Sequence, residues 1–441
     1  MYKGRKGRRC RICMGCGLCP GVSAERPVAA EGKGDAEALQ VLTDSPFVRE
    51  TQGAYGGSVR LVTADVGTTT VAMLLYGADC TVEDRYVALN PQTVYGADVI
   101  SRIRAAESGD RAEDMRRKIL NVLEQGLERF KKRLAAGESL QLVLAANTTM
   151  TYLLMGWDTS ELGRAPFRAS HLKGAETDIG GVPCFIFPGI SAFVGGDIVA
   201  GMYACGMENR DEVTLLVDLG TNGEIVLGDR VRRIACATAA GPAFEGGVNR
   251  GVWGADMVSR LAALRRTGLL DETGLLAEEC FENGVRVGNV HVTRDAVRAV
   301  QLAKGAIAAG IGVLLEKFGV KEEQVDRVVL AGGFGYYLNP EDAAEIGLLG
   351  QKLAGRAMAG GNTALSGALK AGRELCAQRR DGTWTAEERG GSQTAYGDIK
   401  EVLQRLICGT KVLNLAEEPD FEKRYIEAIN LQSRIDILQR R

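Results

Sequence analysis

Two short segments of one type constrain this chain most. In residues 59–77 an apolar run, VRLVTA, leads into DVGTTT and then VAMLLYG, and in residues 213–228 VTLLV leads into DLGTNGE and then IVLG. Each polar turn joins one strand-like run to another, so both segments are predicted to be β-hairpins. Two similar hairpins, one in each half of the chain, predict a duplicated lobe.

Both turns carry the groups that a phosphate site needs. Such a site uses backbone amides that point inward, glycine where a side chain would clash, and hydroxyls or a metal to meet the charge. Asp65 and Asp218 directly follow a strand and are predicted to orient Mg2+ through water, because this hard cation takes oxygen ligands and keeps part of its hydration shell. The predicted nucleotide contacts are Gly67, Thr68, Thr69, Thr70, Gly220, Thr221, Asn222 and Gly223.

One such turn alone is most simply an ordinary hairpin loop. Two copies followed by the glycine turn of LAGGFG (330–335) favour a nucleotide site instead. Neither turn matches G-x-x-x-x-G-K-[ST] or G-x-G-x-x-G, since both of those motifs lead from a strand into a helix.

The rest of the chain alternates strands, glycine turns and helices. Residues 112–134 and 295–319 are predicted to be helices, the first amphipathic and the second largely buried. Residues 140–150 are predicted to be a buried strand that ends in a polar turn, and residues 325–335 a strand that enters a glycine turn. This succession is an α/β pattern, and 441 residues suffice for two lobes.

Composition excludes several classes of partner. Apolar residues make up 45% and charged residues 25%, with a formal charge of -2, which gives no general attraction to nucleic acid. No run resembles a membrane helix or the apolar core of a signal peptide, so we expect a cytoplasmic protein with no membrane partner. The two histidines, His171 and His291, are expected to be structural or surface residues.

Four of the eleven cysteines form one tight run, CRICMGCGLCP, in which Cys10, Cys13, Cys16 and Cys19 precede a proline. It resembles the bacterial ferredoxin run that ligates 4Fe-4S clusters, although two residues rather than three precede the last cysteine. A structural zinc site with four thiolates is the main alternative. The single cysteines are expected to be packing residues: Cys80, Cys184, Cys205, Cys236, Cys280, Cys376 and Cys408.

The paired hairpins resemble the superfamily of acetate and sugar kinases, heat-shock chaperones and actin, in which two phosphate hairpins and an adenosine motif close on a nucleotide from opposite lobes. The resemblance implies ATP and Mg2+ as cofactors. It assigns the adenosine loop to Gly332, Gly333 and Gly335, and a ribose contact to Glu245 in the segment 238–247.

Longer motifs resemble one branch, the ATP-dependent reductive activators of corrinoid proteins. They include NPQTVYGADVISRI (90–103), AANTTMTYLLMG (145–156), GGDIVAGM (195–202), AAGPAFEGG (239–247), QLAKGAIAAGI (301–311) and LAEEPDFEKRYIEAI (415–429). The resemblance implies a two-lobed, actin-like α/β ATPase fold with a short N-terminal iron-sulfur segment. The expected domains are a cluster segment (1–22), a linker (23–58), a first lobe (59–210) and a second lobe with a C-terminal extension (211–441).

That resemblance implies reduction of an inactive Co(II) corrinoid, bound to a methyltransferase-system protein, to Co(I). Electrons would pass from a donor such as ferredoxin or flavodoxin through the 4Fe-4S cluster, and ATP would drive the change. A homodimer is left open.

Three other functions fit part of the sequence. A small-molecule kinase on this fold would have no use for the N-terminal cysteines. An activator of 2-hydroxyacyl-CoA dehydratases would hold its cluster between two subunits, with cysteines inside the lobes. A nucleotide-gated chaperone that exchanges a damaged cofactor would need ATP and no redox centre.

Overall fold

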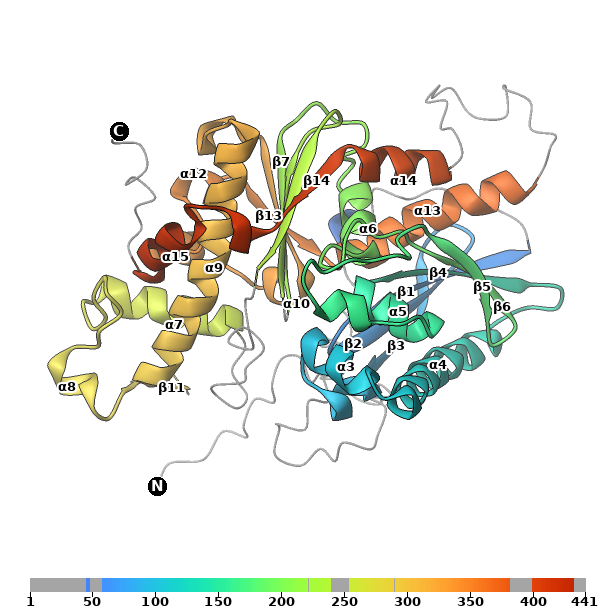
Figure 1. The fold of residues 1–441 in the computed structure, drawn as a ribbon, viewed down its shortest axis with the longest axis horizontal. Helices are drawn as coiled ribbons and strands as arrows, with labels where there is room; N and C mark the ends of the chain where they lie inside the picture. The colour runs from blue at the N-terminus through green and yellow to red at the C-terminus, as the bar shows by residue number, and fades with distance from the viewer. Residues whose placement is uncertain are drawn as a thin grey trace.

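The structure is a computed structural model, and it describes residues 45–47, 58–220, 222–238, 254–288, 290–380 and 399–431. Two six-stranded sheets stand next to each other, with helices between them and on both outer sides (Figure 1). The cysteine run at 10–19, Thr221 and Glu245 lie outside the described residues.

The first sheet contains the first predicted hairpin. Its strands, in spatial order, are β3 (Val82–Leu89), β2 (Thr70–Tyr76), β1 (Val59–Val66), β4 (Ser139–Ala146), β6 (Val182–Ile186) and β5 (Ala175–Ile179). Strands β1, β2 and β3 form an antiparallel meander, while β4 runs parallel to β1 and β6 parallel to β4. Helices cover both faces, which explains why β1 and β4 read as nearly continuous apolar runs.

The second sheet repeats this plan. Its strands, in spatial order, are β13 (Ala357–Gly361), β12 (Arg327–Ala331), β7 (Thr214–Leu219), β8 (Gly223–Gly228), β9 (Arg233–Thr238) and β14 (Thr410–Leu413). Again three strands form a meander, and β12 and β13 follow in parallel. The duplicated lobe and the two-lobed α/β fold are therefore confirmed.

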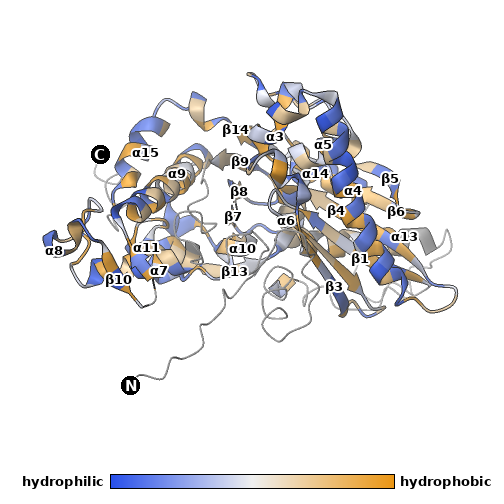
Figure 2. Cartoon of the chain, turned by 90° about the horizontal axis from the view of Figure 1, so that it is seen from below, coloured by the Kyte–Doolittle hydropathy of each residue, from blue (hydrophilic) through white to orange (hydrophobic). Residues whose placement is uncertain are grey.

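Three groups of longer helices complete the layers. Outside the first sheet lie α3 (Val99–Ala106), α4 (Gly109–Lys131) and α5 (Thr148–Met155). Between the sheets lie α6 (Gly196–Ala204), α13 (Thr363–Arg380) and α14 (Ile399–Cys408). Outside the second sheet lie α7 (Gly254–Arg266), α9 (Arg294–Phe318) and α15 (Phe421–Ile429). Figure 2 shows apolar residues, in orange, along the strands. It shows polar residues, in blue, on the outward surface of helices such as α4.

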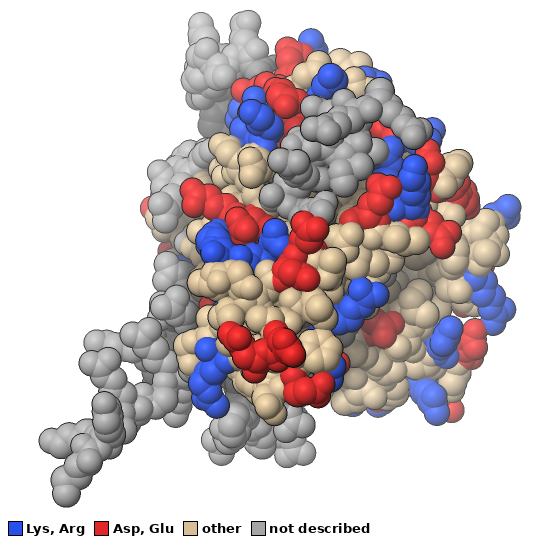
Figure 3. Space-filling model, turned by 90° about the vertical axis from the view of Figure 1, so that its left-hand side faces the viewer, with Lys and Arg blue, Asp and Glu red and all other residues tan. Residues whose placement is uncertain are grey.

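Shorter elements fill the connections. They are η1 (Pro91–Tyr95), η2 (Ser160–Gly163), α8 (Glu278–Phe281), β10 (Val285–Val287), β11 (Val290–Val292), η4 (Glu322–Gln324), α10 (Gly332–Gly335), α11 (Pro340–Glu345), α12 (Gln351–Ala354) and η5 (Leu415–Glu417). On the side of the molecule seen in Figure 3, basic and acidic side chains are interspersed. The described surface on that side therefore offers no broad basic stripe of the kind that binds nucleic acid.

The middle helix layer belongs to both lobes. Helix α13 follows the second-lobe strand β13, yet it packs on β1 and β4 of the first sheet and across α6. A Cβ atom at Gly367 of α13 would lie 1.9 Å from the carbonyl oxygen of Ala200 in α6, so the two backbones touch where the helices cross. The part of the predicted second lobe that follows β13 thus contacts the first sheet as well.

The sequence-predicted helices are present as α4 and α9. The predicted polar turn after β4 is instead the start of helix α5, because the Asn147 side chain accepts a hydrogen bond from the Met150 amide and caps the helix. Within the predicted linker, the described residues pack against the lobes: Phe47 is buried in the core shared by both sheets, and the Ser45 hydroxyl donates to the Gly360 carbonyl at 2.7 Å.

Helix α9 is the one helix of the described residues that is long and apolar enough to cross a membrane. Its most apolar window is 78% buried, against β8, β9 and α15. It is therefore a core helix of the second lobe.

Two glycine substitutions test the helix crossing. Gly367→Ala forces the Ala200 carbonyl to move and should destabilise the protein by about 1–3 kcal/mol, the range of overpacked cores. Gly312→Ala in α9 is the control, because its Cβ atom would meet only Arg424 at 3.6 Å and alanine is the better helix former by ~1 kcal/mol. Thermal melting should show opposite shifts, and equal shifts would contradict the tight crossing.

Candidate nucleotide site

The first turn closes as a tight hairpin between β1 and β2. The Gly67 amide donates to the Thr70 carbonyl at 2.9 Å. A Cβ atom at position 67 would lie 3.0 Å from that same oxygen, so glycine lets the chain turn this sharply. The Thr68 side chain is buried, and its hydroxyl accepts a hydrogen bond from the Asn147 amide group at 3.1 Å.

The segment 90–103 holds this turn from behind. The Asn90 side-chain amide donates to the Gly67 carbonyl at 2.8 Å, and the Asn90 backbone amide donates to the Thr69 carbonyl at 2.8 Å. The buried guanidinium of Arg102 donates to the Thr68 carbonyl at 2.5 Å. Since C=O and N–H point in opposite directions across a planar peptide, these contacts aim the amides of Thr68 and Thr69 away from the supporting segment, as a phosphate loop requires.

The second turn is also a hairpin, but it is one residue shorter, because Leu219 pairs with Gly223 whereas Val66 pairs with Val71. The Gly220 amide donates to the Asn222 carbonyl at 3.0 Å, and Gly223 begins β8 opposite Leu219. Asp218 lies level with Glu224 of β8 and with Ala331 at the end of β12. The predicted adenosine loop follows Ala331 directly and therefore starts beside the second turn.

Gly332 makes this approach possible. Its φ of +80° is a conformation that other residues rarely adopt, and a Cβ atom there would lie 2.6 Å from Oδ1 of Asp218. Gly333 and Gly335 continue into the short helix α10, where Gly335 packs on the backbone of Leu330. The structure thus brings the predicted adenosine loop into contact with Asp218.

Four carboxyl groups from four elements, β1, α6, β7 and β8, lie near one another between the hairpins. Burial, together with the nearby Asp197 and Asp65, raises the pKa of Asp218 to about 8. Burial and Asp65 raise the pKa of Asp197, in the first turn of α6, to about 7. Burial raises the pKa of Asp65 to about 6, opposed by a hydrogen bond from Asn362. Glu224 also has a raised pKa, mainly from burial and then from Asp197 and Asp218.

The donor set fits a hard divalent cation. All four groups are oxygen donors, and each is harder to ionise without a nearby positive charge. In the described part of the chain, no three His, Cys, Asp or Glu side chains are arranged to ligate one ion together. This suits Mg2+, which usually binds through waters, one or two carboxylates and substrate phosphates rather than in an all-protein cage.

Sequence reasoning missed Asp197 and Asn362. Asp197 lies in GGDIVAGM, where a glycine pair before an acidic first helical turn was the available signal. Asn362 directly precedes the apolar helix α13, the position of a capping residue, and its amide donates to Oδ2 of Asp65 at 2.7 Å. Neither signal predicts that Asp197 lies near Asp218 of the second sheet or that Asn362 bonds Asp65 of the first sheet.

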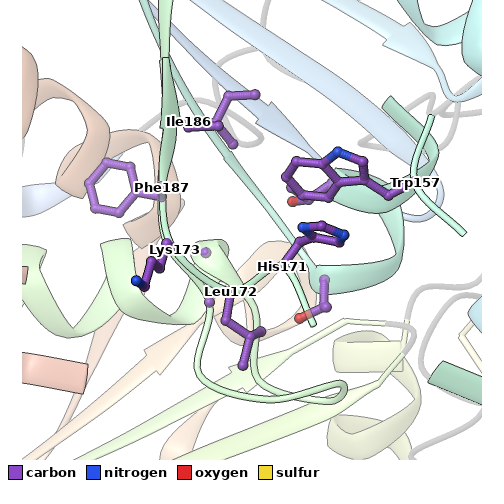
Figure 4. Close-up of a pocket in the computed structure, with 11 residues that line it drawn as sticks. Trp157, His171, Leu172, Lys173, Ile186 and Phe187 are labelled. Carbon is purple, nitrogen blue, oxygen red and sulfur yellow. The ribbon is translucent and has the colours of Figure 1, made fainter. Parts of the chain in front are cut away.

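A separate small pocket lies in the first lobe (Figure 4). The exposed His171 ring stacks on Trp157 there with ring centroids 4.4 Å apart, and the His171 backbone amide donates to the Tyr152 hydroxyl at 2.7 Å. His171 is thus a surface residue with a packing role. His291 is also exposed and lies on β11, so the expectation for both histidines is confirmed.

The single cysteines follow the expectation with one clear exception. Cys80, Cys184, Cys205, Cys236 and Cys376 are buried, and Cys280 is partly buried. Cys408 is exposed, so its prediction as a packing residue is wrong: it ends α14 on the solvent side, where the Gln404 side chain donates to its sulfur at 3.1 Å.

The raised pKa of Asp218 predicts that the stability of the free protein depends on pH. Between pH 4 and pH 8 the folded protein keeps a proton on Asp218 that the unfolded chain has lost, so ionisation favours unfolding as the pH rises. Without nucleotide or divalent cation, Asp218→Asn should therefore melt at a higher temperature than wild type, with the gain about 2 °C or more larger at pH 8 than at pH 5. A gain that does not vary with pH would contradict the raised pKa.

The support of the first turn predicts a second outcome. Asn90→Asp can still accept from the Gln92 amide but cannot donate to the Gly67 carbonyl. Because misplaced amides lose contact with phosphate, ATP binding measured by calorimetry should weaken by ~10-fold or more. The control Asn414→Asp changes an exposed capping asparagine and should leave ATP binding unchanged. Equal affinities in the two variants would show that the Asn90 contact does not orient the turn.

Two family models match consecutive parts of the chain. Residues 61–210 match the RACo middle region, and residues 212–252 and 248–381 match the C-terminal domain of RACo, the ASKHA domain. A solved structure titled reductive activator for corrinoid, iron-sulfur protein superposes with a TM-score of 0.69 at 27% identity, covering 85% of this chain and 66% of that one.

Two curated relatives have names that also refer to corrinoid activation or reduction. The corrinoid activation enzyme RamQ of Eubacterium limosum is 30% identical over 65% of this chain and 59% of its own length. The [Co(II) methylated amine-specific corrinoid protein] reductase of Methanosarcina barkeri is 25% identical over 50% of this chain and 52% of its own length. The chain thus spans between half and two thirds of these relatives. With its middle region and ASKHA domain matched in sequence and its fold matched in structure, the chain belongs to the RACo family, as its motifs indicated.

Proposed function

We propose that this protein is an ATP-dependent reductive activator of a corrinoid protein. It would reduce an inactive Co(II) corrinoid on a methyltransferase-system partner to Co(I), with ATP hydrolysed between its lobes. The observation that carries the proposal is the group of Asp65, Asp197 and Asp218 between the two hairpin turns in a RACo-family chain. The names of the relatives, corrinoid activation enzyme and corrinoid protein reductase, support the substrate class.

Such a reduction needs an energy source. For one electron, each ~60 mV of unfavourable potential corresponds to about 1.4 kcal/mol, so a gap of several hundred millivolts exceeds what ordinary contacts supply. Nucleotide binding can provide this energy by favouring one arrangement of the lobes over another, provided that it binds the two arrangements with different affinity. Helix α13, which packs on both lobes, offers the mechanical connection.

The chain's own residues divide the work at the nucleotide. The amides of Thr68 and Thr69 would bind phosphate oxygens, and Asp65 and Asp218 would orient the cation through water. Mg2+ supplies charge neutralisation of the phosphates when bound. We assign to the Asp197 carboxylate the role of accepting the proton of the attacking water, since it adjoins Asp65 without being in either phosphate turn.

Electrons would enter through a 4Fe-4S cluster on Cys10, Cys13, Cys16 and Cys19. These residues lie outside the described part of the chain, and their spacing is the support for the cluster. A ferredoxin or flavodoxin would be the donor, and the reaction would take place in the cytoplasm.

The test is anaerobic purification with iron and sulfide analysis, followed by an assay for ATP-dependent reduction of a Co(II) corrinoid on a candidate partner protein. We expect an iron- and sulfide-loaded protein that reduces the corrinoid only with ATP. Asp218→Ala should abolish the ATP-driven reduction and leave the cluster spectrum unchanged, because Asp218 binds nucleotide rather than iron.

Four outcomes would count against parts of the proposal. A colourless, zinc-loaded protein with active ATPase would contradict the electron-transfer role and leave the nucleotide site intact. Phosphorylation of a small molecule would point to a kinase, and ATP-driven exchange of corrinoid without reduction would point to a chaperone. Loss of cluster in Asp218→Ala would show that nucleotide and electron functions are not divided between the lobes and the cysteine run.

A further inference from the structure

Asn362 joins the two lobes at the nucleotide site. It stands between β13 of the second sheet and α13, and its Nδ2 donates to Oδ2 of Asp65 in the first sheet at 2.7 Å. Its Oδ1 accepts from the Leu365 amide at 2.8 Å and caps α13. One side chain thus bonds both the first turn of a helix and the carboxylate that we assign to the cation site.

The body of α13 is fixed on the first lobe at two points of close approach. Gly367 touches the Ala200 carbonyl of α6, and a Cβ atom at Gly372 would lie 2.5 Å from the Leu61 side chain of β1. Interfaces this close cannot slide gradually, so α13 should move with the first sheet as a unit. A change in lobe arrangement would therefore be concentrated where α13 meets β13, which is the position of Asn362.

A second feature lies in the first turn of α13, directly after Asn362. The Thr363 hydroxyl is buried, with 1% of the residue exposed, and it has no hydrogen-bond partner among the described residues. It faces Gly201 of α6, where a Cβ atom would lie 2.9 Å from the hydroxyl oxygen. A buried hydroxyl without a partner costs free energy, so a small shift of this turn that satisfies it would be favourable.

We propose that Asn362 is a positioning residue that orients Asp65 for the divalent cation and transmits the state of that site to α13. The inference deepens the proposed function and rests on it for the identity of the ligand, Mg2+ with ATP. When a cation engages Asp65 the amide must follow or release the carboxylate, and either response acts on the helix that Asn362 caps.

Two substitutions separate this role from simple capping. Asn, Asp and Ser cap helices about equally well, so a capping role predicts that Asn362→Ser and Asn362→Asp behave like wild type. Asp has no donor for Asp65 and places a second carboxylate against it. The Ser hydroxyl stands one bond closer to the backbone than the Asn amide nitrogen, so its donor falls short of Asp65. We expect kcat for ATP hydrolysis at saturating Mg2+ to fall by ~10–100-fold in Asn362→Ser and further in Asn362→Asp, with KM for ATP changed less than about 2-fold.

The matched controls are Asn414→Ser and Asn414→Asp. Asn414 is an exposed asparagine that caps η5 by accepting from the Ala416 amide, and both substitutions should leave kcat and KM unchanged. An Asn362→Asp protein as active as wild type would overturn the positioning role.

A double-mutant cycle tests the contact without any nucleotide. In the free protein, Asn362→Ser should lower the melting temperature of wild type but have little further effect on Asp65→Ala, because the partner is already absent. Equal shifts in both backgrounds would refute the contact. Since this cycle needs no ATPase, it remains decisive even where the corrinoid assay fails.

Hydrogen exchange tests the transmission. Addition of Mg2+ with a non-hydrolysable ATP analogue should change the exchange of the Leu365 and Ser366 amides in wild type and leave them unchanged in Asn362→Ser. Unchanged exchange in wild type would show that the state of the nucleotide site does not reach α13.

Discussion

The burial of carboxyl groups close to one another is the constraint at the centre of this protein. Asp65, Asp197 and Asp218 come from both sheets and from the helix layer between them. Burial makes each harder to ionise, and for Asp197 and Asp218 the neighbouring carboxyl groups add to this effect. The chain accepts this loss of stability at one place, as functional sites commonly do. A divalent cation with phosphate would relieve it, so the same groups that weaken the free protein would hold the nucleotide complex together.

Neighbouring residues and two helices hold these carboxyl groups and the turns beside them in place. Asn90 and Arg102 fix the first turn through its carbonyls, while Gly332 lets the adenosine loop reach Asp218. The helices α6 and α13 then join the two sheets through a shared core. Because α6 carries Asp197 and Asn362 caps α13, the layer that connects the lobes also supplies the site with polar groups.

Local sequence was a good guide where a pattern is short and repeated. The two hairpins, the long helices α4 and α9 and the glycine turn at 332 were predictable, since strand and helix periodicity and turn glycines act over a few residues. The start of α5 at Asn147 was predicted as a turn, because a polar run after a strand reads the same whether the chain bends or a cap begins a helix. Cys408 was misjudged for a related reason: the last turn of an amphipathic helix can face either way.

By itself the sequence determined the two hairpin turns, the duplicated α/β plan and the family, because these depend on residues close together in the chain or on long motifs. Only the tertiary structure decided that Asp197 joins Asp65 and Asp218, and that Asn362 reaches Asp65 across 297 positions. The physical reason is that such contacts depend on how two sheets pack on the helices between them. That packing is fixed by many apolar contacts and by backbone clearances such as that at Gly367, none of which leaves a local pattern.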